Sequence, residues 1–239
     1  MRKSVWLVAR AVLAMTAFLL PLSAYATPLY DITVLGTFNT DGTGVNNRGQ
    51  VTGYYAINSS LTEHAFLYSN GSLMDLGTLG GTTSFGVSIN NRGQVTGGSF
   101  TSSGNEHAFL YSGGVMTDLG TLGGTQSAGL GINDRGQVTG YSFTSSGATQ
   151  AFLYSNGSMM DLGTLGGPTS VGQGINDRSQ VTGYALTSGG AENAFVYSKG
   201  QMTRYPWWDR QLRLWHQRSG PGGGVFVSPG RNGFPCLLI

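Results

Sequence analysis

Histidine recurs at fixed places in the chain, where its spacing could serve metal chemistry. His64 and His107 lie 43 residues apart, and each begins the sequence His-Ala-Phe-Leu-Tyr. Imidazole nitrogens are zinc ligands, so two such rings side by side would suit a metal site. The next two copies carry Gln150 and Asn193 at this position. A position that accepts His, Gln and Asn favours a hydrogen-bonding role at the start of a strand, and we predict no metal there.

Repeated aspartates raise the question of calcium. One set lies in Asp-Leu-Gly-Thr-Leu-Gly-Gly, and a second set alternates with asparagine just before a repeated arginine. A calcium loop needs densely alternating carboxylates and a bidentate glutamate, which this spacing lacks. Asx turns and hydrogen bonds to a neighbouring repeat explain these acids better, and calcium is the less favoured alternative. The acids are Asp75, Asp118, Asp161, Asp134 and Asp177, and we expect them to pair with Arg48, Arg92, Arg135 and Arg178.

Catalysis would need residues that break the repeat, because a reaction occurs at one place whereas a repeat copies its residues everywhere. The chain has no Gly-x-Ser-x-Gly, no His-Glu-x-x-His and no phosphate loop. Glu63, Glu106 and Glu192 are themselves near-copies of one another. We therefore predict no catalytic residues and no enzyme activity.

The elements that carry these residues are copies of one 43-residue unit. His-Ala-Phe-Leu-Tyr and its variants begin at residues 64, 107, 150 and 193, and Asn-Asn/Asp-Arg-Gly/Ser-Gln-Val-Thr-Gly recurs with nearly the same step. Fixed periods of this length are typical of propellers and other repeat architectures. No window has the apolar period of a helix.

Each unit predicts four short strands. Ala-Phe-Leu-Tyr-Ser is followed by Asn70-Gly71 or Asn156-Gly157, a hairpin signal, and then by Leu-Met-Asp-Leu-Gly-Thr-Leu. The third strand is expected over residues 84–89 and the fourth in Gln-Val-Thr-Gly-Tyr-Ser-Phe. Four strands in one unit match a blade of a β-propeller, with a β-solenoid as the alternative. The residues expected between blades are Phe66, Leu67, Leu76, Leu79, Ile89, Val95 and their copies.

The first unit is expected to be incomplete. Residues 35–38, Leu-Gly-Thr-Phe, align with the Leu-Gly-Thr-Leu of the second strand, so the chain would enter the repeat half-way. The last unit could then supply the missing first strand and close the ring, which leaves no open sheet edge. We expect the array to be incomplete as written and the intact protein to have at least five blades.

The N-terminus has the features of a secretory signal peptide. Arg2, Lys3 and Arg10 precede or begin an apolar run, and Ala24-Tyr25-Ala26 suits cleavage after residue 26. We therefore expect a secreted protein without a transmembrane segment after cleavage. Residues 27–203 carry ten carboxylates against five cations, a charge of −5, which argues against nucleic acid as a partner. The single cysteine, Cys236, allows no internal disulfide.

These motifs together resemble the bacterial HAF family of extracellular repeat proteins, which is named after the His-Ala-Phe triplet. The resemblance rests on His-Ala-Phe-Leu-Tyr, Asp-Leu-Gly-Thr-Leu-Gly-Gly and Ile-Asn-Asp-Arg-Gly-Gln-Val-Thr-Gly, and it covers residues 31–203. It implies a secreted bacterial repeat protein and supplies no activity.

Residues 204–239 depart from the repeat. Met202-Thr203 is followed by Arg-Tyr-Pro-Trp-Trp instead of Asp-Leu-Gly-Thr-Leu. Permitted codons for residues 205–224, read one nucleotide later, encode Thr-Leu-Gly-Gly-Thr-Asp-Ser-Phe-Gly-Ser-Gly-Ile-Asn-Asp-Arg-Gly-Gln-Val-Ala-Gly, a further copy of the repeat. We interpret this tail as a frameshifted and disordered segment rather than a tryptophan-rich strip that binds nucleic acid.

The predicted protein is therefore an all-β, secreted and monomeric repeat protein, with residues 1–26 as signal peptide and 27–203 as the propeller domain. Its predicted function is non-catalytic binding of a glycan or a protein at the cell exterior, through polar loops such as residues 101–104 and 144–147. The alternatives are an extracellular polysaccharide- or peptide-cleaving enzyme on a propeller scaffold, and a structural surface protein.

Overall fold

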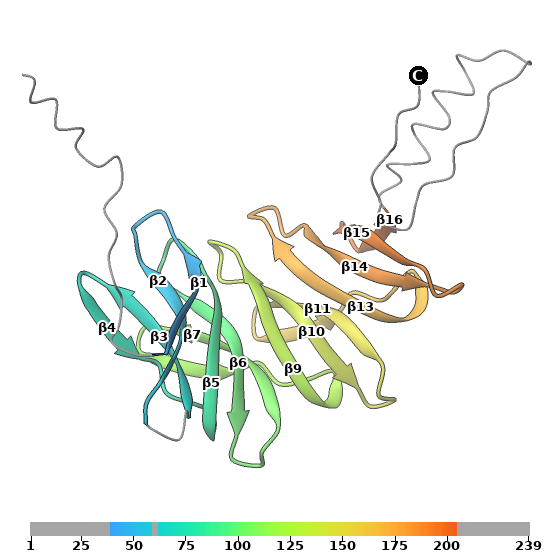
Figure 1. Cartoon of the computed structure of the whole chain (residues 1–239). Helices are drawn as coiled ribbons and strands as arrows, with labels where there is room; N and C mark the ends of the chain where they lie inside the picture. Colours follow the sequence, from blue (N-terminus) through green and yellow to red (C-terminus); the bar gives the residue numbers. More distant parts are fainter. Residues whose placement is uncertain (1–38, 59–61, 205–239) are drawn as a thin grey trace, which may run out of the picture. The chain divides into compact units, whose positions relative to one another are not determined.

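The computed structural model describes residues 39–58 and 62–204, which lie in the second of two compact units, Leu35–Ile239. The described part forms sixteen strands in four consecutive groups of four, which we call blades 1 to 4 (Figure 1). Blade 1 has β1 (Thr40–Val45), β2 (Val51–Ala56), β3 (Glu63–Ser69) and β4 (Ser72–Asp75). Blade 2 has β5 (Gly80–Ile89), β6 (Val95–Thr101), β7 (Glu106–Ser112) and β8 (Val115–Asp118). Blade 3 has β9 (Gly123–Ile132), β10 (Val138–Thr144), β11 (Thr149–Ser155) and β12 (Ser158–Asp161), and blade 4 has β13 (Gly166–Ile175), β14 (Val181–Thr187), β15 (Glu192–Ser198) and β16 (Gln201–Arg204).

Every blade is an antiparallel meander, in which each strand pairs with the next one along the chain. Blades 3 and 4 are also joined by a single parallel pair, Thr149 with Thr169. The chain is thus an all-β array of propeller-type blades. The β-solenoid alternative is wrong, because solenoid coils pair in parallel whereas these strands pair antiparallel within each blade.

The hairpins between the third and fourth strands are those that the Asn-Gly pairs predict. Asn70 has φ of 51° and Gly71 has φ of 81°, and Asn156 and Gly157 have 53° and 80°. Two successive residues at positive φ make the tight turn whose twist matches a right-handed strand pair. This part of the sequence prediction is confirmed.

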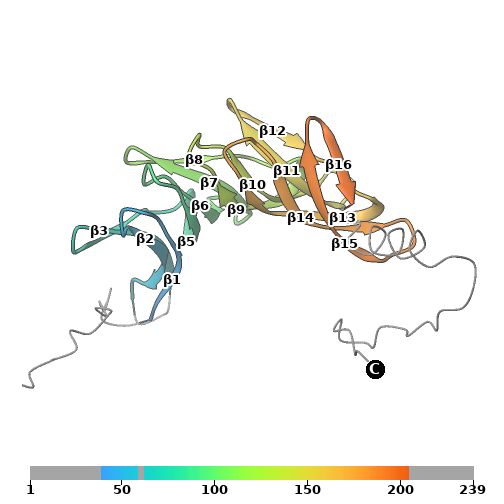
Figure 2. The same cartoon turned by 90° about the horizontal axis from the view of Figure 1, so that it is seen from above.

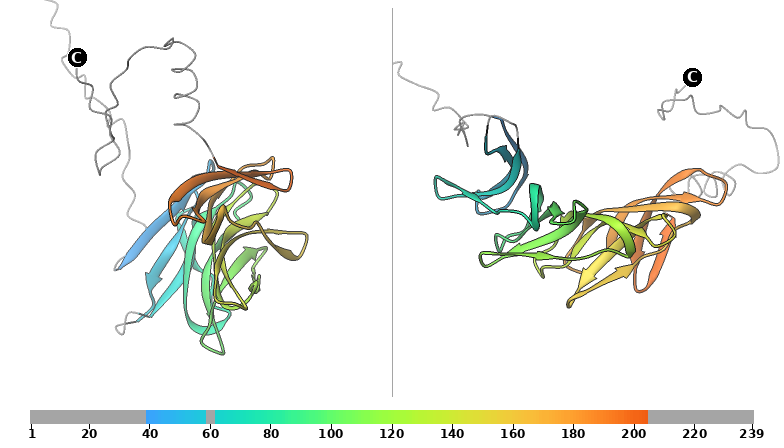
Figure 3. Two further views of the ribbon diagram at one scale, coloured as in Figure 1. Left: turned by 90° about the vertical axis from the view of Figure 1, so that its right-hand side faces the viewer. Right: turned by 90° about the horizontal axis from the view of Figure 1, so that it is seen from below.

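The apolar core lies between consecutive blades. One buried cluster joins Ala65, Leu67 and Leu76 of blade 1 to residues of blade 2, and the same arrangement recurs at the next two interfaces. Figures 2 and 3 show the four blades following one another in chain order, so that each packs against its sequence neighbour. The residues that the sequence places between blades are buried or partly buried there, among them Leu76, Leu79, Ile89 and Val95.

The blade boundary differs from the predicted one. A blade begins with the third predicted strand and ends with the second, so the four strands of blade 1 lie within residues 40–75. The second predicted strand also stops at Asp75, while Leu76 to Leu79 connect one blade to the next. Residues 35–38, on which the expectation of an incomplete first unit rests, lie outside the described residues. The boundary is shifted because a repeated sequence defines its period but not the point at which each unit begins.

Buried hydroxyls tie each blade to the next. Ser84 of β5 accepts a hydrogen bond from the backbone N–H of Ala65 at 2.8 Å and donates to the carbonyl of Gly77 at 2.6 Å. Ser127 and Ser170 make the same pair of bonds at the following interfaces. Since Ala65, Ala108 and Ala151 are fully buried, the serines satisfy backbone N–H groups that water cannot reach.

The predicted signal peptide, residues 1–26, and the residues of the predicted tail from 205 to 239 lie outside the described residues. Within residues 39–58 and 62–204, no helix is long and apolar enough to cross a membrane.

Candidate functional site

The two repeated histidines are each held by an aspartate of the same blade. His64 is the second residue of β3, and its Nδ1 lies 2.9 Å from Oδ2 and 3.0 Å from Oδ1 of Asp75 at the end of β4. The other hydrogen bond of Asp75 Oδ1 comes from the backbone N–H of Gly77 at 2.7 Å. His107, Asp118 and Gly120 repeat this geometry in blade 2. The carboxylate thus fixes the turn that leaves the blade.

The third and fourth copies show what the position requires. Gln150, with its amide nitrogen turned toward Asp161, donates to Oδ1 at 3.2 Å. In blade 4 the acid is absent, because Arg204 pairs with Phe195 in the register that Asp75 has with Phe66. Asn193 instead donates to the carbonyl of Ala191. A hydrogen bond from the second residue of the strand to the aspartate accounts for His and Gln alike.

A histidine oriented by an aspartate is also the base of serine hydrolases, so the pair has to be tested for a nucleophile. Tyr55 donates to Oδ2 of Asp75 at 3.2 Å, which occupies the acid further. Among the described residues no serine, threonine or cysteine hydrogen-bonds to the free ring nitrogen of His64 or His107. The described range likewise contains no group of three or more His, Cys, Asp or Glu that could hold a metal. The arrangement orients a turn and lacks the third partner that acyl transfer needs.

The turns between the first and second strands form a ladder of amide side chains across the blades. In each turn the first asparagine accepts from two backbone N–H groups of its own turn, as Asn90 does from Arg92 and Gln94 at 3.0 Å. Its Nδ2 donates to the backbone carbonyl of the same asparagine in the next blade, from Asn90 to Asn133 at 2.8 Å. The bond recurs between Asn46 and Asn90 and between Asn133 and Asn176.

The second turn residue adds a parallel ladder, and it explains the second set of acids. Asp134 Oδ1 accepts from the backbone N–H of Asn91 at 2.7 Å, and its Oδ2 accepts from Asn91 Nδ2 at 2.9 Å. These bonds, helped by Arg92 and Arg48, lower the pKa of Asp134 below its ordinary value. The prediction that the arginines form ion pairs with the repeated acids is wrong for the described residues, whose ion pairs within 4.0 Å are His64–Asp75 and His107–Asp118. Asp134 and Asp177 instead accept from backbone or amide N–H groups.

Glu106 has an environment different from that of its near-copies, because residue 98 is a glycine. Its carboxylate lies over Gly98, where a Cβ atom would overlap Oε1. The other blades have Tyr54, Tyr141 or Tyr184 at the position of Gly98. Burial raises the pKa of the Glu106 carboxyl, and its charge contributes, after burial, to the raised pKa of Tyr141 in the next blade. Glycine therefore leaves a space that a neighbouring acid fills.

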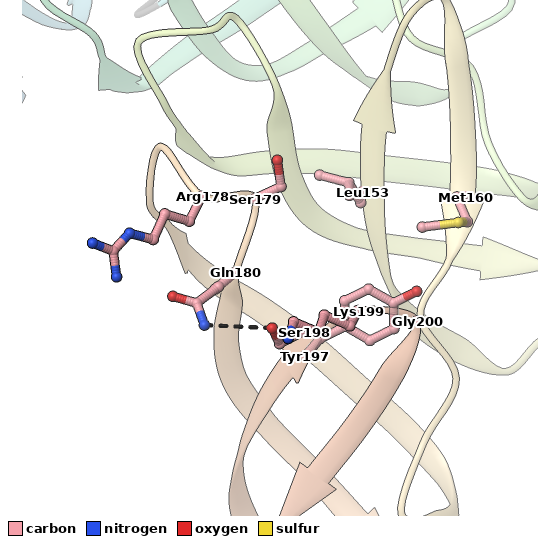
Figure 4. A pocket seen from close by; sticks show the side chains of 9 residues that line it. All are labelled: Leu153, Met160, Arg178, Ser179, Gln180, Tyr197, Ser198, Lys199 and Gly200. Atoms are coloured by element: carbon pink, nitrogen blue, oxygen red, sulfur yellow. Dashed lines mark hydrogen bonds between the residues drawn. The ribbon is translucent and has the colours of Figure 1, made fainter.

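A groove of about 670 Å³ lies between blades 3 and 4 (Figure 4). Leu153 and Met160 line it from blade 3, while the turn 178–180 and the hairpin 197–200 line it from blade 4. In Figure 4 the Arg178 side chain lies on the side of the groove opposite Leu153 and Met160. Gln180 is held in place by a hydrogen bond to Ser198 Oγ at 3.4 Å. We call this space the cationic groove, after Arg178 and Lys199.

A second groove, of about 360 Å³, is lined by other residues of blades 3 and 4. Tyr141 and Tyr184 contribute phenol groups, Gln173 an amide, and Thr149 and Thr169 hydroxyls. Aromatic faces with polar groups around them can hold a small polar ligand. Neither groove was singled out from the sequence, although the serine at 179 and the lysine at 199 are visible there as departures from the repeat.

The loops that the sequence offers as binding elements are closed by their own hydrogen bonds. Thr101 Oγ1 lies 2.9 Å from Ser103 Oγ, and the backbone N–H of Gly104 donates to the carbonyl of Thr101 at 2.9 Å. Residues 144–147 repeat both contacts. The loops are thus exposed and ordered, but most of their polar groups bond within the loop.

Several solved structures share the strand arrangement of this chain. No family model and no curated protein sequence matches the chain. A puromycin-hydrolyzing peptidase from Mycobacterium tuberculosis is similar over 77% of this chain and 32% of its own, with a TM-score of 0.51 and 12% identity. TolB from Acinetobacter baumannii has a TM-score of 0.49 and 13% identity, and the match covers 70% of this chain and 42% of TolB. The β-propeller domain of the Trilobed protease from Pyrococcus furiosus has a TM-score of 0.49 and 11% identity, and the match covers 69% of this chain and 51% of that one.

This chain thus spans about a third to a half of the length of those proteins. At 12% identity, the likeness to the peptidase concerns the fold alone. Together with the four antiparallel meanders, it places the described part of the chain among β-propeller-type structures.

Proposed function

We propose that the protein is a non-catalytic binding module of the cell exterior, which holds a glycan or a protein in the grooves between its blades. The observation that carries the proposal is that the repeated polar side chains and the polar side chains of the groove have different roles. The repeated acids and amides hold turns and join blades, whereas the cationic groove is open and contains side chains that depart from the repeat.

The chemistry of the acids supports binding rather than catalysis. The carboxylates of Asp75 and Asp118 each accept from a histidine and from a backbone N–H group, and Asp134 accepts twice from Asn91. A general acid or base has to be within hydrogen-bond reach of the substrate, and these oxygen atoms already have partners. Among the described residues, the half-buried Glu106 is not paired with a second carboxylate, as the acids of many hydrolases are.

We also infer that the chain is a secreted member of the HAF family. The three motifs that carry that resemblance have structural roles. In blades 1 and 2 the histidine binds the aspartate and the aspartate fixes the exit turn, and the repeated Asn-Asn/Asp-Arg turns join neighbouring blades. The basic and apolar start of the chain, residues 1–26, supports export. Monomeric behaviour is expected.

The test is a binding screen of the purified protein on an array of neutral and acidic polysaccharides and of cell-surface proteins. We expect reversible binding to a ligand that is recovered chemically unchanged, as measured by chromatography of the ligand before and after incubation. Cleavage of a polysaccharide or a peptide would favour the enzyme alternative. Binding to none of the probes would overturn the proposal.

A further inference from the structure

We propose that the cationic groove binds the anionic group of an acidic saccharide, a carboxylate or a sulfate on a sugar ring. This inference rests on the proposed binding function and names the place and the class of ligand. Three features of the groove support it: the backbone conformation of Ser179 and Lys199, the two positive charges, and the contrast between an apolar and a polar side.

The backbone at the groove is held in a conformation that its residues disfavour. Ser179 has φ of 60°, where the corresponding turns have Gly49, Gly93 and Gly136. Lys199 has φ of 52°, where the corresponding hairpins have Asn70, Gly113 and Asn156. Among the described residues, every other non-glycine residue with positive φ is an asparagine. Serine and lysine are less suited to this region than glycine or asparagine, so both departures from the repeat cost backbone energy, and both line one groove.

Ser179 recovers part of this cost within the protein. Its Oγ donates to Oε1 of Gln137 in blade 3 at 2.7 Å, which ties together the two blades that form the groove. For Lys199, no hydrogen bond or ion pair of the side chain with residues 39–58 or 62–204 accounts for the departure from asparagine. Unfavourable backbone conformations are retained where a function requires the side chain, and in this hairpin the requirement falls on the ammonium group.

Charge separates this groove from its counterparts. The corresponding positions between blades 1 and 2 are Arg92 and Gly113, and those between blades 2 and 3 are Arg135 and Asn156. Only the pair of blades 3 and 4 supplies two cations, Arg178 and Lys199, within the described array. Neither of them belongs to the ion pairs of the described residues. The neighbouring carboxylate, that of Asp177, accepts from the backbone N–H of Asp134.

The two sides of the groove favour a sugar over a simple anion. Met160, which is 44% exposed, offers apolar surface, while Leu153 and Tyr197 line the groove as mostly buried side chains. The donors Arg178 and Ser198 lie away from Met160 in Figure 4. A pyranose ring with a carboxylate or sulfate presents an apolar C–H face and a charged edge, which matches this arrangement. An acidic peptide side chain would match the charge but would offer no ring face.

The experiment uses isothermal titration of the whole protein with trigalacturonate, a sulfated trisaccharide, neutral maltotriose and hexaglutamate. Trigalacturonate or the sulfated sugar should bind, and binding should weaken when NaCl is raised from about 0.05 M to about 0.5 M. The arms with the two acidic sugars distinguish a carboxylate from a sulfate. Lys199→Asn, which restores the residue of the repeat, should weaken binding by about tenfold or more without lowering the melting temperature. Arg135→Ala, which removes one positive charge at the blade 2–3 interface, is the matched control and should leave affinity unchanged.

Three results would overturn the inference: equal weakening by Arg135→Ala, full affinity in Lys199→Asn, or equal affinity for hexaglutamate. Failure of both acidic sugars while the array still yields a neutral glycan or a protein ligand would end this inference and leave the proposed function standing. Failure of every probe in both experiments would end both.

Discussion

Glu106 shows how one residue of a repeat acquires a new environment. Glycine at position 98 removes the side chain that the other blades place there, and the Glu106 carboxylate occupies the space beside Tyr141. The pKa of Glu106 is raised by burial, so the folded protein binds this proton more tightly than the unfolded chain. Stability from this group is therefore present below the unfolded value near 4.5 and is lost as pH rises through the higher folded pKa.

We predict that Glu106→Gln stabilises the protein at neutral pH. The amide cannot ionise, so the variant avoids the loss that the wild type suffers above the folded pKa of Glu106. Melting temperatures measured from pH 4 to pH 7 should show the variant gaining on the wild type as pH rises. A constant difference across that range would show that ionisation of Glu106 is not the cause.

Gly129 is a second position at which one atom decides the fit between blades. A Cβ atom there would overlap Oγ1 of Thr96, which is fully buried and donates to the carbonyl of Phe109 at 2.7 Å. Gly86 and Gly172 meet the threonines of their preceding blades in the same way. The glycine is needed for close approach rather than for an unusual φ.

Gly129→Ala should therefore lower the free energy of unfolding by about 1–3 kcal/mol, the usual cost of overpacking. Gly174→Ala is the matched control, because a Cβ there would meet only Thr182 Cγ2 at 3.5 Å, an ordinary contact. Urea unfolding of both variants measures the difference. Equal stability of the two variants would mean that the blades adjust to the extra methyl group.

At the scale of strands, the buried serines connect one blade to the next. Ser170 of β13 accepts from the N–H of Ala151 in β11 and donates to the carbonyl of Gly163. Ser170→Ala would leave the buried N–H of Ala151 and the partly buried carbonyl of Gly163 without this partner, which should cost about 1–3 kcal/mol. Ser158→Ala, at an exposed position of β12, is the control and should change stability little. Denaturant midpoints of the two variants make the comparison, and similar midpoints would argue that water replaces the hydroxyl.

The strands themselves were largely predictable from sequence. Alternation, the Asn-Gly hairpins and the 43-residue period predicted four antiparallel strands per unit, and residues such as Leu76 and Val95 were correctly placed between blades. The boundary of a blade was not predictable, because periodicity has no starting point; it is set by which strands share backbone hydrogen bonds. The cationic groove was not predicted either. Lys199 is visibly unusual in the sequence, but its position beside Met160 of the preceding blade depends on how two blades pack.

At the scale of the whole array, stability should be distributed among neighbouring interfaces. Each described interface contains an apolar cluster, a buried serine that makes two hydrogen bonds, and a hydrogen bond of the asparagine ladder. Repeat arrays of this kind behave as chains of units coupled to nearest neighbours. The Ser170→Ala change at the blade 3–4 interface should therefore have a local effect.

Hydrogen exchange of the Ser170→Ala variant tests that expectation. Amides of β13–β16 should exchange faster than in the wild type, whereas those of β1–β4 should be protected as before. Peptide-level mass spectrometry resolves the blades, since each of them has a distinct stretch of sequence. A uniform rise in exchange across all four blades would mean that the array unfolds as one unit.

The asparagine ladder also bears on how such a protein can change over generations. Asn46, Asn90 and Asn133 each bond to the same backbone atom of the following blade, so an interface recognises its neighbour by a feature common to all copies. A recombination event that duplicates or deletes 43 codons in phase would bring together two surfaces that already fit. The array can therefore be lengthened or shortened by inheritance without a compensating substitution, while a single-copy residue such as Lys199 would be carried along, doubled or lost with its blade.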